Sequence, residues 1–136
     1  MVDIALLTEK RYLVSSSDNP YIQNIVVEDG LVQIELEKLG LSCKRVAWDN
    51  NFDESLFKFA LFRTTWNYFD KLDDFYVFLK KASSVLGFIN PIGQIMWNLN
   101  KKYLLELRDS GINIPESHIV RSKESTSLSN VASLYD

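Results

Sequence analysis

The sequence predicts an α/β fold with a small, open, mostly parallel sheet flanked by helices, followed by an incomplete α+β segment. Two observations support this prediction. Short apolar runs alternate with segments of helical periodicity over roughly the first 95 residues, and the connections between them are short. After that point the pattern offers only a helix, a strand and a serine-rich tail. Right-handed crossovers between the early strands would make them parallel.

Three different signals predict the first strand, loop and helix. The apolar run Asp3–Thr8 predicts a buried strand, and the turn-forming residues of Ser15–Tyr21 predict a loop. Apolar residues recur every three or four positions over Val27–Leu39, which predicts a helix with a wide apolar face packed on the sheet. Gly40 is expected to end this helix, because glycine readily adopts a positive φ.

The rest of the predicted sheet follows in alternating order. Leu41–Trp48 predicts a second strand, and the aromatic-rich run Leu56–Phe62 predicts a third strand at the centre of the sheet. The periodicity of Lys71–Leu86 predicts another helix. Phe88–Pro91 predicts a brief fourth strand that the proline ends.

The character of the chain then changes. Asn100–Ser110 predicts a helix, Ile114–Val120 predicts a strand, and the serine-rich tail favours a linker. The apolar residues of the tail nevertheless have helical spacing, at Leu128, Val131, Ala132 and Tyr135. A helix is therefore an equal alternative for the tail. Because these elements cannot close a core of their own, we expect a second domain that is cut by the end of the chain.

Composition argues against several classes of protein. The net charge is −3, and no run of lysine and arginine is present, so we expect no nucleic-acid partner. No apolar stretch reaches the roughly 20 residues of a membrane span, and the first residues do not have the pattern of a signal peptide. We therefore expect a cytoplasmic protein without a membrane partner. Cys43 is the only cysteine, which excludes an internal disulfide and a cysteine metal motif.

Motifs for nucleotide cofactors and covalent catalysis are missing. None of the five glycines follows the first predicted strand, and neither G-x-G-x-x-G nor a P-loop pattern occurs. His118, the only histidine, has no nucleophile in a recognisable context, so it is assigned a structural or surface role and no catalytic residue is predicted. A flavodoxin-like receiver is disfavoured because the first strand delivers neither an acidic cluster nor a phosphate loop.

The stretch RTTWNY follows the predicted central strand, at the edge where open α/β sheets bind their ligands. Arg63 offers a planar fork that suits a substrate carboxylate, and Trp66 and Tyr68 offer flat walls with polar tips. The alternative is structural: Arg63 would pair with a nearby acid, and the two aromatic residues would cover the edge of the sheet. The residues alone leave both alternatives open.

A second stretch, WNLNKKYL, places Lys101 near the start of a predicted helix. Asn98 or Asn100 can cap this helix, and a lysine at a helix amino terminus adds a charge that attracts phosphate. The plainer alternative is a surface lysine without a ligand.

Taken in order, these stretches resemble the amino-terminal half of ATP-grasp ligases related to glutathione synthetase. Members of that group often read R-S-T-W-D-Y, then N-P, then W-N-x-D-K-x-Y-L, then G-[IV]-x-x-P. This chain reads RTTWNY, NP, WNLNKKYL and GINIP in the same order, and the resemblance covers roughly Asp3–Val120. Asn67 and Asn100 depart from the pattern but keep the size and hydrogen-bonding ability of the usual residue.

The resemblance implies that residues 1–98 form the α/β domain that precedes the ATP-grasp fold and that residues 99–136 form the truncated start of the ATP-grasp domain. The parent protein would be an ATP-dependent carboxylate–amine ligase that acts through an acyl phosphate, with ATP and magnesium as cofactors. Arg63, Trp66 and Tyr68 would bind a small carboxylate or amine substrate, and Lys101 would contact the nucleotide phosphate. Metal ligands and catalytic groups would lie outside this chain, so we expect neither catalysis nor tight cofactor binding from it alone.

A second hypothesis belongs to another class of protein. The chain would be a stand-alone, non-catalytic α/β module for binding or oligomerisation. It predicts a folded, protease-resistant tail and no magnesium-dependent ATP binding. A homo-oligomer is compatible with both hypotheses, because a truncated second domain would leave apolar surface exposed.

Overall fold

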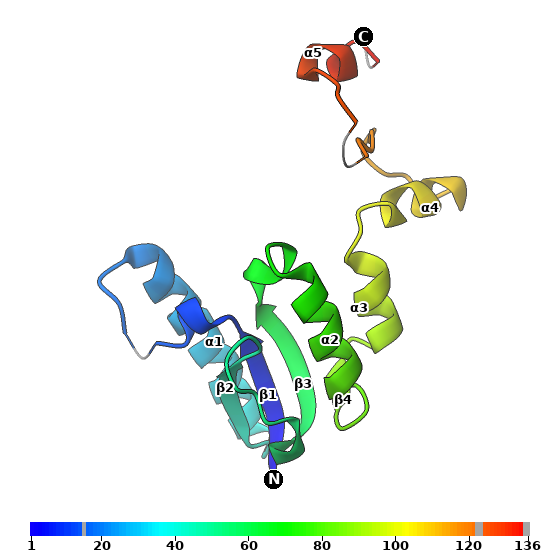
Figure 1. Cartoon of the computed structure of the whole chain (residues 1–136). Coiled ribbons are helices and arrows are strands. Elements are labelled where there is room, and N and C mark those ends of the chain that lie inside the picture. The colour runs from blue at the N-terminus through cyan, green and yellow to red at the C-terminus, as the bar shows by residue number, and fades with distance from the viewer. Residues whose placement is uncertain (15, 122–123, 135–136) are drawn as a thin grey trace. The chain divides into compact units, whose positions relative to one another are not determined.

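The computed structural model describes residues 1–14, 16–121 and 124–134 of the chain (Figure 1). Contacts divide the chain into two compact units, Met1–Ile92 and Gly93–Asp136. The predicted boundary between residues 98 and 99 lies a few residues further along and stays a prediction. Each unit is described by itself below.

The first unit contains a four-stranded sheet with the order β2-β1-β3-β4, and every neighbouring pair is parallel. The strands are β1 (Val2–Thr8), β2 (Cys43–Ala47), β3 (Phe57–Thr64) and β4 (Gly87–Ile89). Strand β1 is buried along most of its length, and β3 lies inside the sheet as expected. The predicted α/β class, a small parallel sheet flanked by helices, is confirmed.

Two helices cover this sheet, α1 (Pro20–Lys38) and α2 (Leu72–Ala82). Short 3-10 helices, η1 (Lys10–Tyr12), η2 (Glu54–Leu56) and η3 (Trp66–Phe69), lie in the connections. The predicted start of the first helix, at Val27, is wrong. The Asn19 side chain accepts a hydrogen bond from the Tyr21 backbone N–H at 3.0 Å, and Pro20 occupies the first helical position. Both features are typical of a helix start.

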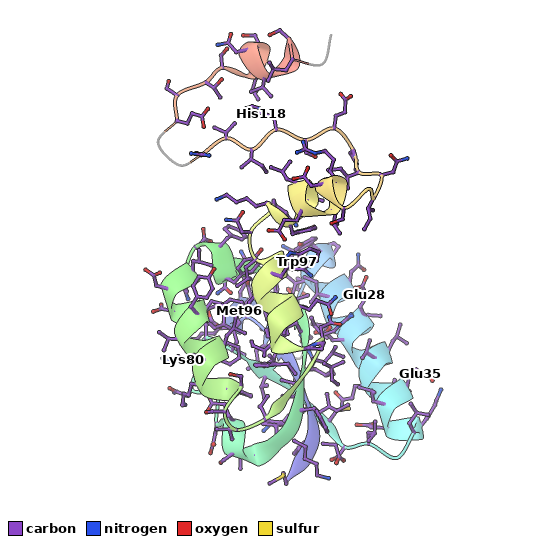
Figure 2. All side chains as sticks on the ribbon, turned by 90° about the vertical axis from the view of Figure 1, so that its right-hand side faces the viewer. Glu28, Glu35, Lys80, Met96, Trp97 and His118 are labelled. Carbon is purple, nitrogen blue, oxygen red and sulfur yellow. The ribbon has the colours of Figure 1, made fainter. Side chains whose placement is uncertain are left out.

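Helices α1 and α2 lie on opposite faces of the sheet (Figure 2). Neighbouring residues of a strand point to opposite faces, and β3 shows this directly. The ring of Phe62 lies 6.0 Å from the ring of Phe75 on α2, whereas Arg63 donates a hydrogen bond to Asp29 on α1. Consecutive residues of the central strand therefore contact different helices, Phe62 on the α2 face and Arg63 on the α1 face.

The core on the α2 face is aromatic. Phe75 is 2% exposed, and the nearest ring centroid, that of Trp48, lies 4.9 Å from its own. Further rings that contact Phe75 belong to Phe62, Tyr68 and Phe78. Of the apolar stripe that the periodicity of the second helix predicts, Phe75, Leu79, Ala82 and Leu86 are buried, whereas Leu72 is 40% exposed.

The α1 face has a different composition. The buried residues of α1 are Ile25 and Asp29, so a carboxylate faces the sheet in the middle of the helix. Of the predicted apolar face, Leu31, Ile34 and Leu39 are exposed by 57%, 47% and 76%. The predicted wide apolar face of this helix is therefore only partly used, since three of its apolar residues point to solvent.

A β-bulge interrupts the pairing of β1 with β3 at their carboxyl ends. Leu7 pairs with Phe62, but Thr8 pairs with Thr64, which leaves Arg63 as an extra residue on β3. Bulges re-aim a side chain and occur frequently next to binding sites. Arg63, the first residue of the RTTWNY stretch, is therefore singled out by the backbone as well as by its side chain.

The remaining helices are α3 (Ile92–Asn98), α4 (Tyr103–Asp109) and α5 (Leu128–Ala132). Helix α3 was not expected, and α4 is shorter than the predicted Asn100–Ser110. Helix α5 bears out the helical alternative for the tail, although Tyr135 of that pattern lies outside the described residues. None of the helices in the described ranges is long and apolar enough to cross a membrane.

The predicted strand Ile114–Val120 is wrong. Residues 112–121 form neither helix nor strand, and Pro115 has no backbone N–H to offer a neighbouring strand. An extended segment becomes a strand only where another strand pairs with it, and the described part of the second unit contains none. Within this unit, the observed structure is thus helical and irregular.

Candidate functional site

The candidate site lies at the carboxyl edge of the sheet, beside β1 and β3. The chain passes from β1 through α1 to β2 on one side, and then crosses to β3 on the other side of β1. This reversal of direction is the topological switch point, outside which open α/β sheets generally bind their ligands. The bulge at Arg63 lies at this point.

Arg63 belongs to a chain of three charged side chains on the α1 face. Its Nε atom donates to Asp29 Oδ1 at 3.0 Å, and Arg45 Nε donates to Asp29 Oδ2 at 3.0 Å. The three side chains Arg45, Asp29 and Arg63 are 13%, 1% and 28% exposed. We call them the arginine–aspartate triad. Two guanidinium charges against one carboxylate leave an excess positive charge, and Arg63 is its most exposed end.

Arg45 anchors the triad to the backbone that follows β1. Its Nη2 and Nη1 atoms donate to the carbonyl oxygens of Tyr12 and Val14, at 2.7 and 3.3 Å. Arg45 is therefore structural, because each of its three guanidinium nitrogens donates a hydrogen bond within the protein. Arg63 differs, because its Nη2 atom lies 4.0 Å from Glu28 Oε2, and the Glu28 side chain is 70% exposed. Such a pair is at the outer limit of an ion pair and beyond hydrogen-bond length.

A second buried acid, Glu9, follows β1 and organises the loop after β3. Its side chain is 1% exposed and accepts hydrogen bonds from Arg11 Nε and, at 2.7 Å, from the Asn67 backbone N–H. The hydrogen bond to Glu9 raises the pKa of Arg11 above its ordinary value. The hydroxyl groups of Thr8 and Thr64, the last residues of β1 and β3, lie 2.5 Å apart. Both strand ends are thereby tied together by polar contacts.

Asn67 joins this loop to the residues after β2. Its side-chain oxygen accepts from the Trp48 indole N–H at 2.8 Å, and its amide nitrogen donates to Asp49 Oδ2 at 2.7 Å. Asp49 also accepts from the Lys10 backbone N–H and from Lys71 Nζ. Burial raises the pKa of the Asp49 carboxyl, but these three hydrogen bonds outweigh it and hold the pKa below its ordinary value.

The two aromatic residues predicted to line the site, Trp66 and Tyr68, pack against different parts of the structure. Trp66 contacts Tyr12 and Tyr21, with ring centroids 5.8 and 6.3 Å away, and is itself 42% exposed. Burial is the main cause that raises the pKa of Tyr12. Tyr68 instead packs against Phe75 of α2, with centroids 5.3 Å apart. Trp66 thus remains an exposed ring beside the start of α1, and Tyr68 contributes to the core on the α2 face.

The predicted nucleotide contact, Lys101, belongs to the second unit. It precedes α4, and its ammonium nitrogen lies 5.3 Å from the centroid of the Tyr103 ring. The Asn100 side chain accepts from the Lys102 backbone N–H at 3.0 Å, so it makes a turn before the helix, and the residue at the cap position is Lys102. The contact of Lys101 with a nucleotide phosphate stays a prediction.

The sequence predicts Arg63 as a site residue but does not predict the residues that contact it, and its role as a substrate contact stays a prediction. The predicted helix start at Val27 places Asp29 in a first helical turn, and Glu9 and Arg45 are not among the predicted site residues. Among residues 1–14, 16–121 and 124–134, every buried side-chain nitrogen or oxygen atom has a hydrogen-bond partner. The same ranges contain no group of three or more His, Cys, Asp or Glu residues that could hold a metal ion. The site is thus a pre-formed polar framework with one outward-facing guanidinium.

Comparison with known proteins identifies similar chains. Residues 4–90 match the family model described as D-cycloserine synthetase DcsG, N-terminal domain. The cycloserine biosynthesis protein DcsG of Streptomyces lavendulae is 28% identical over 83 residues, which are 60% of this chain and 28% of that protein. The crystal structure of D-cycloserine synthetase DcsG matches with a TM-score of 0.68 at 24% identity, over 82% of this chain and 34% of that one. The structural match supports the fold, and the chain spans about a third or less of these relatives.

Proposed function

Since this chain belongs to the family of the N-terminal domain of D-cycloserine synthetase DcsG, we propose that it is the substrate-binding, amino-terminal part of an ATP-dependent carboxylate–amine ligase related to glutathione synthetase. In this proposal ATP activates a carboxylate as an acyl phosphate and an amine then attacks it, in the cytoplasm. The role of the chain is to bind and orient a small carboxylate substrate.

The observation that carries the proposal is the position of Arg63. A guanidinium at a bulge of the central strand, at the switch point of the sheet, lies where ligands of this fold class bind. Asp29 fixes its Nε edge, which orients the two terminal nitrogens without using them. Guanidinium groups bind carboxylates through two parallel hydrogen bonds, so a pre-oriented fork is suited to that ligand class.

Trp66 is the proposed flat wall of this site. Its ring packs against Tyr12 and Tyr21, which limits its freedom, and the exposed part of the ring is open to a ligand. Tyr68 was predicted as a second wall. Because it packs on Phe75, we propose that it supports the site by fixing η3 rather than by flat contact with substrate.

ATP and magnesium fit this chain only in part. Lys101 can supply one positive charge to a phosphate group, but the described residues offer no cluster of metal-binding side chains. Helix α4, which Lys101 precedes, is also short. We therefore assign carboxylate binding to the residues of this chain and derive no step of phosphoryl transfer from them.

The proposal is tested with the full-length natural protein, incubated with Mg-ATP and each of the common L- and D-amino acids in turn. We expect release of ADP that depends on at least one of these carboxylates. In Arg63→Gln, the KM for that carboxylate should rise about 10- to 100-fold, because a charged hydrogen-bonding partner is lost, while the KM for ATP stays unchanged.

Lys44→Gln provides the control, since Lys44 is an exposed cation on the edge strand β2. It should leave both constants unchanged. An Arg63→Gln protein with the KM values of the wild type would contradict the proposal, as would an absence of carboxylate-dependent ADP release across the whole series.

A further inference from the structure

We infer that Glu28 is an internal carboxylate that occupies the ligand-facing side of Arg63 and leaves it when a substrate carboxylate binds. This inference rests on the proposed function and names the residue that sets how readily the site accepts a carboxylate. It follows from two neighbouring acids on α1, which lie near different nitrogen atoms of one guanidinium.

Glu28 and Asp29 differ in burial because of the helical geometry. Successive residues on an α-helix are about 100° apart, so when one faces the sheet its neighbour lies toward the flank. The Asp29 side chain is 1% exposed, whereas that of Glu28 is 70% exposed. Figure 2 labels Glu28 on α1. Asp29 is therefore a fixed partner of Arg63, and Glu28 is a partner that water can replace.

The contacts to Arg63 show the same division. Arg63 Nε donates to Asp29 Oδ1 at 3.0 Å, a normal hydrogen bond. Arg63 Nη2 lies 4.0 Å from Glu28 Oε2, which is a charge contact without a hydrogen bond. The terminal nitrogens thus have a carboxylate nearby that does not satisfy their geometry. A ligand carboxylate that accepts two hydrogen bonds from them would form the stronger contact.

The balance of charges around Arg63 makes Glu28 the residue that controls the affinity for anions. The arginine–aspartate triad alone has an excess positive charge, which would attract anions of many kinds. With Glu28 beside Arg63, an incoming anion must replace a carboxylate, so a ligand gains only if it fits the guanidinium fork better than Glu28 does. Glu28 should therefore lower the affinity for every anion and favour those with carboxylate geometry.

The test uses the 136-residue chain and sodium acetate as the probe, at constant ionic strength and pH 7. Binding is followed by NMR on the Nε–Hε signal of Arg63, which is assigned by its absence in Arg63→Gln. We expect Glu28→Gln to bind acetate about two- to fivefold more tightly than the wild type, the range of a solvent-exposed ion pair. Sodium phosphate should gain more than acetate from the same substitution.

Glu35→Gln is the matched control. Glu35 lies on the same helix, its side chain is 68% exposed, and its partner is Lys38 at 2.7 Å rather than Arg63. It should bind acetate as the wild type does. Equal affinity of Glu28→Gln and wild type, including no measurable binding by either, would overturn the inference.

Arg63→Gln separates the inference from the proposed function. It is followed through the backbone amide signals of Thr64 and Thr65. If Arg63→Gln abolishes acetate binding while Glu28→Gln has no effect, Arg63 is a carboxylate-binding residue and the role inferred for Glu28 is wrong. If Arg63→Gln binds acetate like the wild type, Arg63 is not the carboxylate-binding residue, and the proposed function fails as well.

Discussion

The two faces of the sheet are stabilised by opposite chemistry. On the α2 face, Phe75 lies among aromatic rings and is 2% exposed. On the α1 face, the corresponding central residue of the helix is Asp29, a carboxylate that two arginines neutralise. Burying a paired charge adds little net stability compared with burying apolar groups, because the ions must first lose their water. The comparison indicates that the α2 face maintains the fold and that the α1 face maintains the geometry of one guanidinium.

The largest expected effect comes from the aromatic face. Phe75→Ala should lower the free energy of unfolding by about 4 kcal/mol, because it removes a buried ring and leaves a cavity. Urea unfolding followed by circular dichroism measures this change. Val77→Ala on the same helix is the control, since Val77 is 67% exposed, and it should cost no more than about 0.5 kcal/mol. A Phe75→Ala protein as stable as this control would break the comparison.

The next effect tests the polar face. Asp29→Asn keeps the shape of the side chain but removes the charge that two guanidiniums share, and should cost about 3 kcal/mol in the same urea experiment. Glu28→Gln, one residue away and 70% exposed, should change the unfolding free energy by about 0.5 kcal/mol or less. Equal effects of the two substitutions would show that the burial of Asp29 does not matter to stability.

The smallest effect concerns Asp49, at the seam between the loops after β1, β2 and β3. Its folded-state pKa lies below its ordinary value, so its stabilisation is present above the unfolded pKa of about 3.9 and is lost as the pH falls through the folded pKa. Asp49→Asn should therefore cost about 1.5 kcal/mol at pH 7, and this difference from the wild type should shrink as the pH is lowered below about 4.

Unfolding of both proteins across pH 2 to 8 measures this dependence. Asp18→Asn offers a control, because Asp18 is an exposed carboxyl in the loop before α1. Its curve should follow that of the wild type throughout. A difference for Asp49→Asn that grew as the pH fell would reverse the assigned sign.

The α2 face could be predicted from the sequence because its signals are local and periodic. Apolar residues repeat every three or four positions along α2, and the strands are short apolar runs with turns between them. The position of Arg63 at the end of a central strand follows from the same pattern. These parts of the fold depend on burial of apolar surface, which a sequence shows directly.

The α1 face could not be predicted, and an incorrect helix start is the reason. With a helix beginning near Val27, Asp29 belongs to a first turn, where an acid is favoured by the helix dipole. In the structure α1 begins at Pro20, so Asp29 lies in the middle of the helix, four residues after the buried Ile25. The Asn19-Pro20 pair was the signal that could have placed the start correctly. The bulge at Arg63 has no such signal, since no glycine or proline marks it.

The bulge separates the side chain at position 63 from the pairing that holds β1 and β3 together. Thr8 takes Thr64 as its partner and passes over position 63, so that position contributes no cross-strand pair to β1. Asp29 would keep Arg45 as a counter-ion if another residue stood at position 63. Under the proposed function, a lineage with this architecture changes its specificity by replacing one side chain, while the order and alignment of its strands are inherited intact.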